Sequence, residues 1–169
     1  PKDLEYLGTT TPRFVFGLNL NANWREWDFG AVFQGVGKRN FYLAQEIMAP
    51  FSVTWGNFSY EMHNDYWTPE NPNAALPRHY AGSGHNYQIS DHWLQNAAYL
   101  RMKNLQLGYS FKKELINKIG IERLRIYFSG ENLFEFSKLN KNFDPELTST
   151  SGYIYPIMRS FSCGINLTF

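Results

Sequence analysis

The sequence predicts an all-β protein that forms part of a transmembrane antiparallel β-barrel. Apolar and polar residues alternate with a period of two over several stretches of about ten residues. The connections between these stretches alternate between short and very long, as they do in outer-membrane barrels. Aromatic residues make up 18% of the 169 residues, yet the mean hydropathy is −0.44. Asn, Ser, Gly and Gln stand between the aromatic residues, which is unusual for the core of a soluble domain.

Five segments show the alternation. The expected strands span residues 13–24, 26–37, 98–111, 122–134 and 157–169. In the last of them Phe161, Cys163 and Ile165 alternate with small or polar residues, so we expect the small thiol side chain of Cys163 to face lipid. In the third strand the alternation is regular only after Lys103, which indicates a β-bulge at that point.

The connections fall into two classes. Residues 25 and 26 form a tight turn, and 112–121 is a short link in which one or two helical turns end at Gly120 as a C′ glycine. In contrast, 38–97 and 135–156 are long loops. Loops of such length without regular structure are uncommon in compact soluble domains and are usually functional. Short links on one side and long loops on the other indicate that 38–97 and 135–156 are extracellular.

Strand length and the placement of aromatic residues agree with a membrane barrel. The apolar positions from Phe14 to Trp24 cover roughly 23 Å along the membrane normal at a tilt of about 45°, close to the apolar band of such barrels. Aromatic residues gather at the two ends of the strands, as interfacial girdles do. The girdle at the short links holds Trp24, Trp27, Phe111 and Phe169; the girdle at the long loops holds Phe14, Phe33, Phe134 and Phe161.

Five strands are too few to close a barrel, because membrane barrels have eight or more and an open edge in lipid leaves backbone groups unpaired. We therefore expect the chain to be a fragment of a larger barrel. No apolar run of about 18 residues and no signal-peptide pattern is present. Scattered charges with a net charge of +1 argue against a nucleic-acid partner. The single cysteine excludes an internal disulfide framework. A soluble β-sandwich with one polar sheet face is the alternative fold.

Polar residues of the strands are expected to face the barrel lumen. The candidates that point there are Asp28, Gln34, Arg125, Tyr127 and Glu131. Such side chains either contact a plug or line the transport path. Arg101 and Lys103 precede the regular apolar stretch of their strand, and we expect them to meet lipid headgroups or lipopolysaccharide phosphates.

Aromatic residues of the long loop are the candidates for ligand or partner contact. They are Trp55, Tyr60, Tyr66, Trp67, Tyr80, Tyr87 and Trp93. Aromatic rings stack on the apolar faces of sugars and also anchor protein interfaces. A loop of this length also needs a core of its own, and packing is the alternative role of each ring. The two prolines between Trp67 and Asn73 are expected to stiffen the loop.

Catalytic and metal-binding motifs are weak. Ala81-Gly-Ser-Gly-His85 lacks the spacing and the strand–turn–helix setting of a nucleophile elbow. The four histidines have no helical metal-ligand spacing, and the loop carboxylates are expected to be solvated. These carboxylates are Glu61, Asp65, Glu70 and Asp91. We expect no catalytic residue, no metal and no cofactor, and therefore no enzyme.

Eight short stretches and the C-terminal segment resemble the SusC/RagA-like TonB-dependent transporters in order and spacing. They are Thr11-Pro-Arg-Phe14, Phe33-Gln-Gly-Val-Gly-Lys-Arg39, Trp67-Thr-Pro-Glu-Asn-Pro-Asn-Ala74, Leu94-Gln-Asn-Ala-Ala-Tyr-Leu-Arg101, Lys103-Asn-Leu-Gln-Leu-Gly-Tyr109, Ser129-Gly-Glu-Asn-Leu-Phe134, Phe143-Asp-Pro-Glu146, Arg159-Ser-Phe161 and the terminal Gly164-Ile-Asn-Leu-Thr-Phe169. The match covers about residues 8–169. No single motif among them is specific, but together they are.

The resemblance implies a 22-stranded barrel in the Gram-negative outer membrane, closed by an N-terminal plug, of which this chain supplies the last five strands. It further implies a SusD-like surface lipoprotein as partner, energy from the TonB complex, and import of an oligosaccharide or, second, a peptide. The plug and the TonB box are not in this sequence. Two other functions stay open at this stage, a soluble carbohydrate-binding or adhesive β-domain and a passive porin, and the upstream sequence distinguishes the transporter from the porin.

Overall fold

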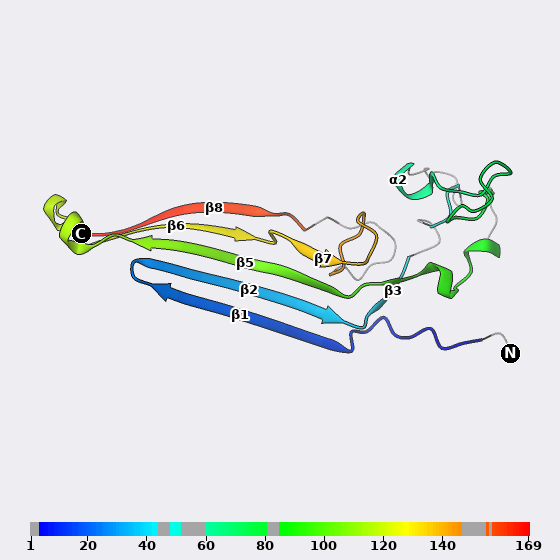
Figure 1. Cartoon of the computed structure of the whole chain (residues 1–169), viewed down its shortest axis with the longest axis horizontal. Coiled ribbons are helices and arrows are strands. Elements are labelled where there is room, and N and C mark those ends of the chain that lie inside the picture. The colour runs from blue at the N-terminus through cyan, green and yellow to red at the C-terminus, as the bar shows by residue number, and fades with distance from the viewer. Residues whose placement is uncertain (1–3, 44–47, 52–59, 81–84, 147–154, 156) are drawn as a thin grey trace.

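A single antiparallel sheet with a loop unit at one end makes up the chain in this computed structural model, which describes residues 4–43, 48–51, 60–80, 85–146, 155 and 157–169 (Figure 1). The long strands are β1 (Phe14–Trp24), β2 (Trp27–Gly37), β5 (Tyr99–Ser110), β6 (Arg123–Glu131) and β8 (Ser160–Thr168). They pair in the order β1-β2-β5-β6-β8, each antiparallel to its neighbours. Their bounds agree within three residues with the predicted ranges.

The two short links lie together at one end of the sheet (Figure 1). Trp24 pairs with Trp27, so only two residues connect β1 to β2, and Arg25 has a φ of 55°. The second link contains α3 (Lys113–Ile116) and η3 (Asn117–Ile119) and ends at Gly120, whose φ is 76°. A glycine adopts this left-handed conformation without steric cost, so the predicted helical turns and their C-terminal glycine are confirmed.

The predicted bulge is present at Lys103. Val32 of β2 pairs with Asn104, whereas the next residue, Phe33, pairs with Met102, so Lys103 is the extra residue of β5. Its carbonyl oxygen accepts a hydrogen bond of 3.2 Å from the backbone N–H of Asn132 on the other side of the strand. Because side chains alternate with a period of two, one extra residue reverses the face on which the preceding residues of β5 lie.

One face of the sheet, here called the outer face, is apolar across all five long strands. A representative row runs through the paired residues Leu20, Ala31 and Leu105, and another runs through Phe29, Leu107, Phe128 and Cys163. Ring pairs lie at both ends of this face: Trp27 and Tyr109 have centroids 4.9 Å apart at the short links, and Phe33 and Phe134 6.2 Å apart toward the loops. This arrangement matches the two predicted girdles.

Short elements occur in both long loops, which the sequence had predicted to lack regular structure. The first loop contains β3 (Asn40–Tyr42), α2 (Tyr60–His63), η1 (His85–Tyr87), η2 (Asp91–Trp93) and β4 (Leu94–Asn96), and the second begins with β7 (Glu135–Ser137). β3 pairs with β4, and β7 pairs with β5. Three-residue strands show no detectable alternation, and their pairing partners are far away in sequence. Within the described part of the chain, no helix has the length and apolarity needed to cross a bilayer.

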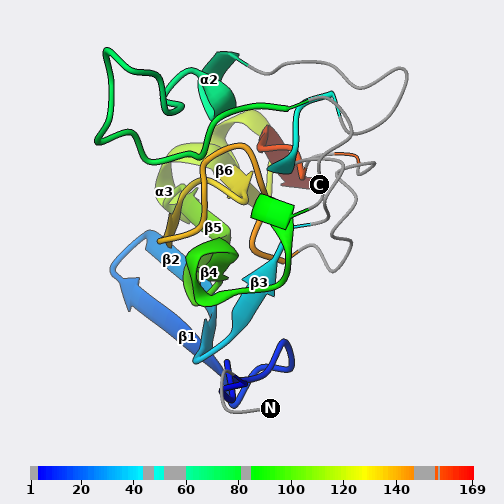
Figure 2. The same ribbon diagram turned by 90° about the vertical axis from the view of Figure 1, so that its right-hand side faces the viewer.

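The first loop folds over the loop end of the sheet around its own core, as the view along the strands shows (Figure 2). The buried residues of this core are Phe41, Leu43, Met48, Ala49, Tyr87, Trp93, Ala97 and Leu139. Leu139 belongs to the second loop, and the backbone N–H of Asn140 donates to Gln95 Oε1 at 3.2 Å. The described residues of the two loops therefore form one folded body, here called the loop unit (residues 38–43, 48–51, 60–80, 85–97 and 135–146).

Candidate functional site

The five predicted lumen residues share the polar face of the sheet, here called the inner face. Asp28 pairs with Gly108 and Gly108 with Tyr127, which places Asp28 and Tyr127 in one row. Gln34 pairs with Arg101, and Glu131 pairs with Asn104. Ser160 Oγ donates to Glu131 Oε2 at 3.1 Å, so this carboxylate is held by the neighbouring strand.

An ion pair crosses the middle strand of the inner face. Arg125 donates from Nε to Asp28 Oδ1 at 2.9 Å and from Nη2 to Asp28 Oδ2 at 2.5 Å, a two-point contact between β6 and β2. The pair passes over Gly108, where a Cβ atom would lie 2.4 Å from Asp28 Oδ1. Tyr127 covers Gly164 in the same way, since a Cβ there would meet its phenol oxygen at 2.4 Å. Glycines thus make room for the large polar groups of this face.

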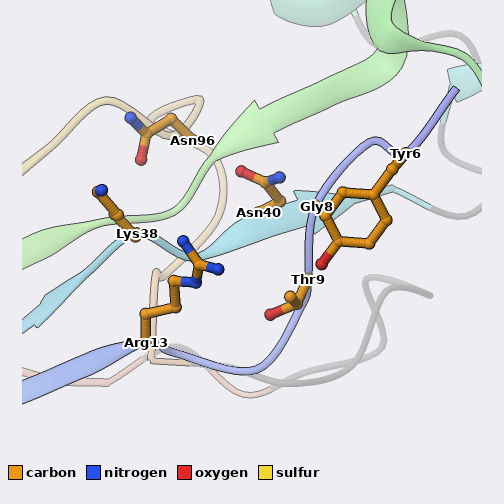
Figure 3. A pocket seen from close by; sticks show the side chains of 7 residues that line it. All are labelled: Tyr6, Gly8, Thr9, Arg13, Lys38, Asn40 and Asn96. Atoms are coloured by element: carbon orange, nitrogen blue, oxygen red, sulfur yellow. The ribbon is translucent and has the colours of Figure 1, made fainter.

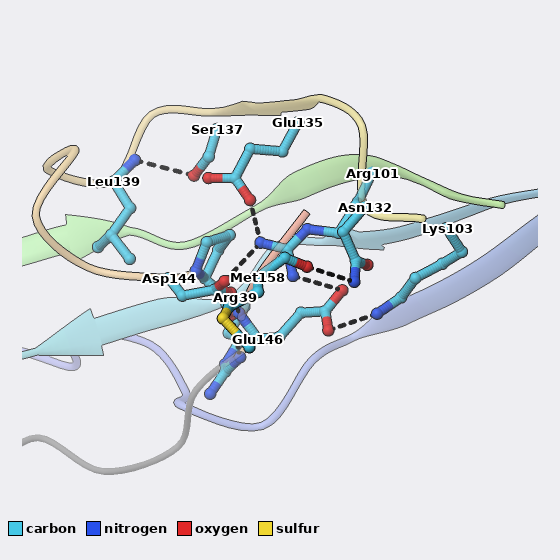
Figure 4. A network of polar contacts seen from close by, with 11 residues as sticks. Arg39, Arg101, Lys103, Asn132, Glu135, Ser137, Leu139, Asp144, Glu146 and Met158 are labelled. Carbon is cyan, nitrogen blue, oxygen red and sulfur yellow. Dashed lines mark hydrogen bonds and ion pairs between the residues drawn. The ribbon is translucent and has the colours of Figure 1, made fainter. Parts of the chain in front are cut away.

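A cluster of charged side chains, here called the buried ion cluster, closes the loop end of the inner face (Figure 4). Arg101 is 3% exposed and donates from Nη2 to Glu135 and, at 2.7 Å, to Asp144 Oδ2. Glu146 lies 3.2 Å from Arg101 Nη1 and accepts from Lys103 Nζ at 2.6 Å. Asp144 and Glu146 belong to the Phe143-Asp-Pro-Glu146 motif of the second loop. The cluster thereby attaches that loop to the sheet.

The predicted contact of Arg101 and Lys103 with headgroup phosphates is therefore wrong. The bulge at Lys103 places Arg101 on the inner face, opposite Gln34, and both cations are already paired with carboxylates. The three carboxylates of the cluster come from 34 to 43 residues further along the chain. Sequence spacing gives no signal of such a long-range contact, and only the family resemblance singles out the motif around Asp144.

Two of the seven loop aromatics belong to the core of the loop unit. Tyr87 is 3% exposed, Trp93 is 8% exposed, and their ring centroids lie 5.4 Å apart. Trp93 donates its indole N–H to the carbonyl oxygen of Asn86 at 2.9 Å. Burial without a charged partner raises the pKa of the Tyr87 phenol above its ordinary value. For Tyr87 the packing role therefore prevails over ligand contact.

A cavity of about 490 Å³ in the loop unit is lined by Trp67 and Trp93. Trp67 is 38% exposed, and its backbone N–H donates to the carbonyl oxygen of Leu76 at 2.9 Å. The remaining lining residues bring one cation and several polar groups: Ala74, Ala75, Leu76, Pro77, Arg78, Asn86, Ser90 and His92. An aromatic wall with polar groups around it is typical of a site for a polar organic ligand. We call this space the Trp67 cavity.

The other aromatic candidates lie elsewhere on the loop unit. Tyr60 is 75% exposed on α2, and Tyr80 is exposed with the Arg78 guanidinium 5.3 Å from its ring centroid. Tyr66 stacks on His79 with ring centroids 4.4 Å apart. Burial, together with the charge of neighbouring His63, lowers the pKa of His79. Trp55 lies outside the described residues.

The weak catalytic and metal motifs gain no support from the geometry. Among the described residues, no group of three or more His, Cys, Asp or Glu side chains is placed to hold a metal ion. Asp65 accepts hydrogen bonds from Asn71 Nδ2 and the Ala75 backbone at 3.0 and 3.2 Å, so it stabilises the turn after Trp67. Asp91 accepts from the N–H of His92 at 2.8 Å. Residues 81–84 and the Glu61 side chain lie outside the described part.

Curated proteins similar to this chain are TonB-dependent receptors. TonB-dependent receptor P3 of Formosa agariphila is 27% identical over 99% of the chain, and TonB-dependent receptor SusC of Bacteroides thetaiotaomicron is 36% identical over 92% of it. The chain spans only 17% and 15% of the length of these two relatives. No protein-family model matches the chain.

Solved structures give the same assignment. The structure of the RagAB peptide transporter matches 96% of the chain with a TM-score of 0.75 at 26% identity, and the chain covers 18% of that structure. The RagAB peptide importer in its open-open state matches with a TM-score of 0.73 at 27% identity. The chain is a SusC/RagA-like barrel segment. The predicted resemblance, the β-barrel fold class and the outer-membrane location are confirmed.

For a SusC/RagA-like segment, the two faces of the sheet acquire a direction. We propose that the outer face lies toward lipid and that the inner face, with the Asp28–Arg125 pair and the buried ion cluster, lies toward the lumen. In this proposal the loop unit, which lies at one end of the sheet (Figures 1 and 2), stands on the extracellular side.

Proposed function

We propose that this chain belongs to a TonB-dependent transporter that imports a nutrient across the outer membrane. The substrate is an oligosaccharide in the first place and a peptide in the second. The partners are a SusD-like surface lipoprotein, which acts as a lid, and the TonB complex, which acts through a part of the protein outside this chain. Import of this kind requires binding and passage of the substrate, so we assign no enzymatic activity to the chain.

The observation that supports this function most directly is the Trp67 cavity at the mouth of the barrel. Trp67 offers an aromatic surface for the C–H face of a sugar ring. Arg78 and Asn86, which also line the cavity, offer hydrogen-bond donors to hydroxyl groups. The same groups suit peptide carbonyl and carboxylate oxygens. The peptide alternative is favoured by the similarity to the RagAB peptide transporter.

The exposed aromatic residues of the loop unit support a contact with a lid. Tyr60 and Tyr80 are exposed side chains outside the Trp67 cavity. Tyrosine is enriched at the energetic centres of protein interfaces, because it combines a large apolar ring with a hydroxyl group. The inner face continues the proposed path. Its polar and charged side chains can form hydrogen bonds with a substrate that passes along them toward the periplasm.

Transport by the full-length protein tests the role of the cavity. Trp67→Ala is expected to lower uptake of the cognate labelled oligosaccharide about fivefold, the effect of losing one aromatic interaction of about 1 kcal/mol. Tyr155→Ala removes an exposed aromatic residue outside the cavity and should leave uptake unchanged. Uptake of a labelled peptide library by the same strains separates the two substrate classes. Equal uptake by the two variants would show that the Trp67 cavity has no role in import.

Shortening the loop tests the contact with the lid. We expect deletion of about residues 45–90 to leave a barrel that still inserts, because long surface loops are shortened at little entropic cost. Co-purification of the lipoprotein and growth on the nutrient should be lost. Since that deletion also removes core residues such as Met48 and Tyr87, a smaller one is the matched control. Removing residues 67–75 and joining Tyr66 to Leu76 through a flexible linker of about a dozen residues, which their parallel β-bridge requires, takes away Trp67 and keeps the core.

Heat-modifiable gel mobility reports whether each deletant is folded. A long-loop deletant that assembles, retains the lipoprotein and transports at the normal rate would contradict the role of residues 38–97. For the short deletion we expect loss of uptake with retention of the lipoprotein. Loss of the lipoprotein there would place the lid contact at residues 67–75 instead.

A further inference from the structure

A second cavity, of about 290 Å³, lies beside the start of β1 at the loop end of the sheet (Figure 3). Its lining residues are Tyr6, Gly8, Thr9, Arg13, Lys38, Asn40 and Asn96. Two of them, Arg13 and Lys38, are exposed cations, and none of the described lining residues is acidic. In the described ranges no carboxylate forms an ion pair with either cation. We call this space the Arg13 cavity.

Backbone contacts build the Arg13 cavity. The segment before β1 runs beside β3, where the Asn40 N–H donates to the Thr9 carbonyl oxygen at 3.0 Å and Asn40 Nδ2 donates to the Leu7 carbonyl oxygen at 2.7 Å. Gly8 has a φ of 98°, and a Cβ atom there would lie 2.3 Å from Asn40 Nδ2. Only a glycine permits this close approach. Arg13 extends from the start of β1 toward the centre of the lining residues (Figure 3).

The position of Lys38 places this cavity on the lipid-facing side. Lys38 Nζ lies 5.9 Å from the ring centroid of Phe14, which belongs to the outer face and to the girdle at the loop end. The next residue, Arg39, turns the opposite way: its Nη1 donates to the carbonyl oxygen of Pro145 at 2.7 Å, next to the buried ion cluster. The cavity therefore lies just beyond the aromatic girdle, at the depth of the outer-leaflet headgroups.

We propose that the Arg13 cavity binds a phosphate group of lipopolysaccharide in the outer leaflet. A guanidinium group matches two phosphate oxygens, and a lysine ammonium adds a compact charge. Basic pockets at headgroup depth are suited to anionic lipid headgroups. Two cations that line one cavity also repel each other, and a bound anion removes this repulsion. A transported carboxylate is a poor candidate, because the path of import lies on the opposite face. The site is thus independent of the imported substrate.

Lipopolysaccharide retention by the full-length transporter, purified in detergent, tests the proposal. Arg13→Gln combined with Lys38→Gln is expected to weaken lipopolysaccharide binding about 30-fold, the effect of removing two additive cations at an anionic lipid surface. The matched control is Lys113→Gln combined with Lys118→Gln, which removes two exposed cations at the short links. The control should bind like the unmodified protein. The amount of lipid A per protein, measured by mass spectrometry, is the readout.

Three binding arms identify the ligand: native lipopolysaccharide, the same material after enzymatic dephosphorylation, and inorganic phosphate as a competitor. We expect tight binding only in the first arm and weak competition in the third. Equal binding of dephosphorylated lipopolysaccharide, or equal retention by the glutamine variant and its control, overturns the proposal. Inorganic phosphate that binds as tightly as the lipid overturns the lipid assignment.

A charge-conserving variant separates a binding defect from a folding defect. Arg13→Lys combined with Lys38→Arg keeps both charges and should retain lipopolysaccharide within about threefold of the unmodified protein, since the point-charge attraction persists. Loss of binding as large as in the glutamine variant overturns the proposal. Heat-modifiable gel mobility verifies that each variant is folded before binding is compared.

Discussion

Asp28 and Arg125 meet across a strand that belongs to neither of them, because Gly108 of that intervening strand has no side chain to keep them apart. The pair joins β2 to β6 over β5 and is partly exposed, with side-chain exposures of 32% for Asp28 and 14% for Arg125. This geometry makes the ion pair and the glycine a single unit. Removal of either is expected to undo the same contact.

Gly108→Ala and Asp28→Asn should therefore be non-additive. Each is expected to lower the free energy of unfolding by about 1 kcal/mol, the upper end for a partly exposed ion pair. In the Asp28→Asn background, Gly108→Ala should cost less than alone. Urea unfolding of the full-length barrel in lipid vesicles measures these energies. Gly37→Ala, where a Cβ would make ordinary contacts of 3.6 Å with Phe14, is the control. Strictly additive losses of stability would show that Gly108 and the Asp28–Arg125 ion pair act independently.

Arg101 and Arg125 lie on the same face but differ in burial, and their substitution by methionine should differ accordingly. Arg101→Met leaves three carboxylates of the buried ion cluster without their central cation, and we expect a loss of about 3–5 kcal/mol. Arg125→Met should cost about 1 kcal/mol because its partner Asp28 remains hydrated. The same unfolding assay compares them. Equal losses would show that the cluster is hydrated in the assembled barrel.

The direction of the two faces is testable on β8. Ile165, which pairs with Ile126 on the outer face, should tolerate arginine poorly, with a loss of about 2–4 kcal/mol near the midplane. Asn166→Arg should be milder because it faces the lumen, but Arg125 lies directly opposite and adds like-charge repulsion. Ser162→Arg, opposite Ser129, is the better control. Similar losses for Ile165→Arg and Ser162→Arg would mean that the assignment of the faces is wrong.

The His79 environment predicts a pH dependence of the loop unit. Burial and the nearby charge of His63 lower the pKa of His79 below its ordinary value of 6.5, so the unfolded loop binds this proton more tightly than the folded loop does. The stability that neutral His79 contributes to the folded loop is present above pH 6.5 and is lost as the pH falls through the lowered pKa of His79. Limited proteolysis of the loop should accelerate from pH 7 to pH 5, and His79→Phe should reduce the acceleration. The exposed His85→Gln should not alter it.

Local patterns predicted the sheet well. Three predicted features each depend on only a few consecutive residues, and each is confirmed. They are the period of two along β1 and β8, the bulge at Lys103 and the helix end at Gly120. Arg101 shows where this approach fails. The face of the sheet on which Arg101 lies depends on how the extra residue Lys103 is accommodated. Its partners are carboxylates more than 30 residues away in sequence.

Aromatic composition alone also did not separate the roles of the loop residues. Trp67 and Tyr87 look equivalent in sequence, yet Trp67 lines a cavity and Tyr87 is enclosed by residues from several segments. Burial of a ring is decided by tertiary contacts, such as the one that brings Leu139 of the second loop into the core of the first. No spacing rule encodes such a contact.

Leu139 in that core and the hydrogen bond from Asn140 to Gln95 have a practical consequence for chimeric transporters. A loop grafted alone from a relative would arrive without the residue that fills its core, and the host would keep a second loop shaped for a different neighbour. Residues 38–97 and 135–146 therefore form the smallest segment pair to exchange when specificity is to be moved between related barrels. Three of the four cut points fall near the outer ends of β2, β5 and β6, where the sheet begins.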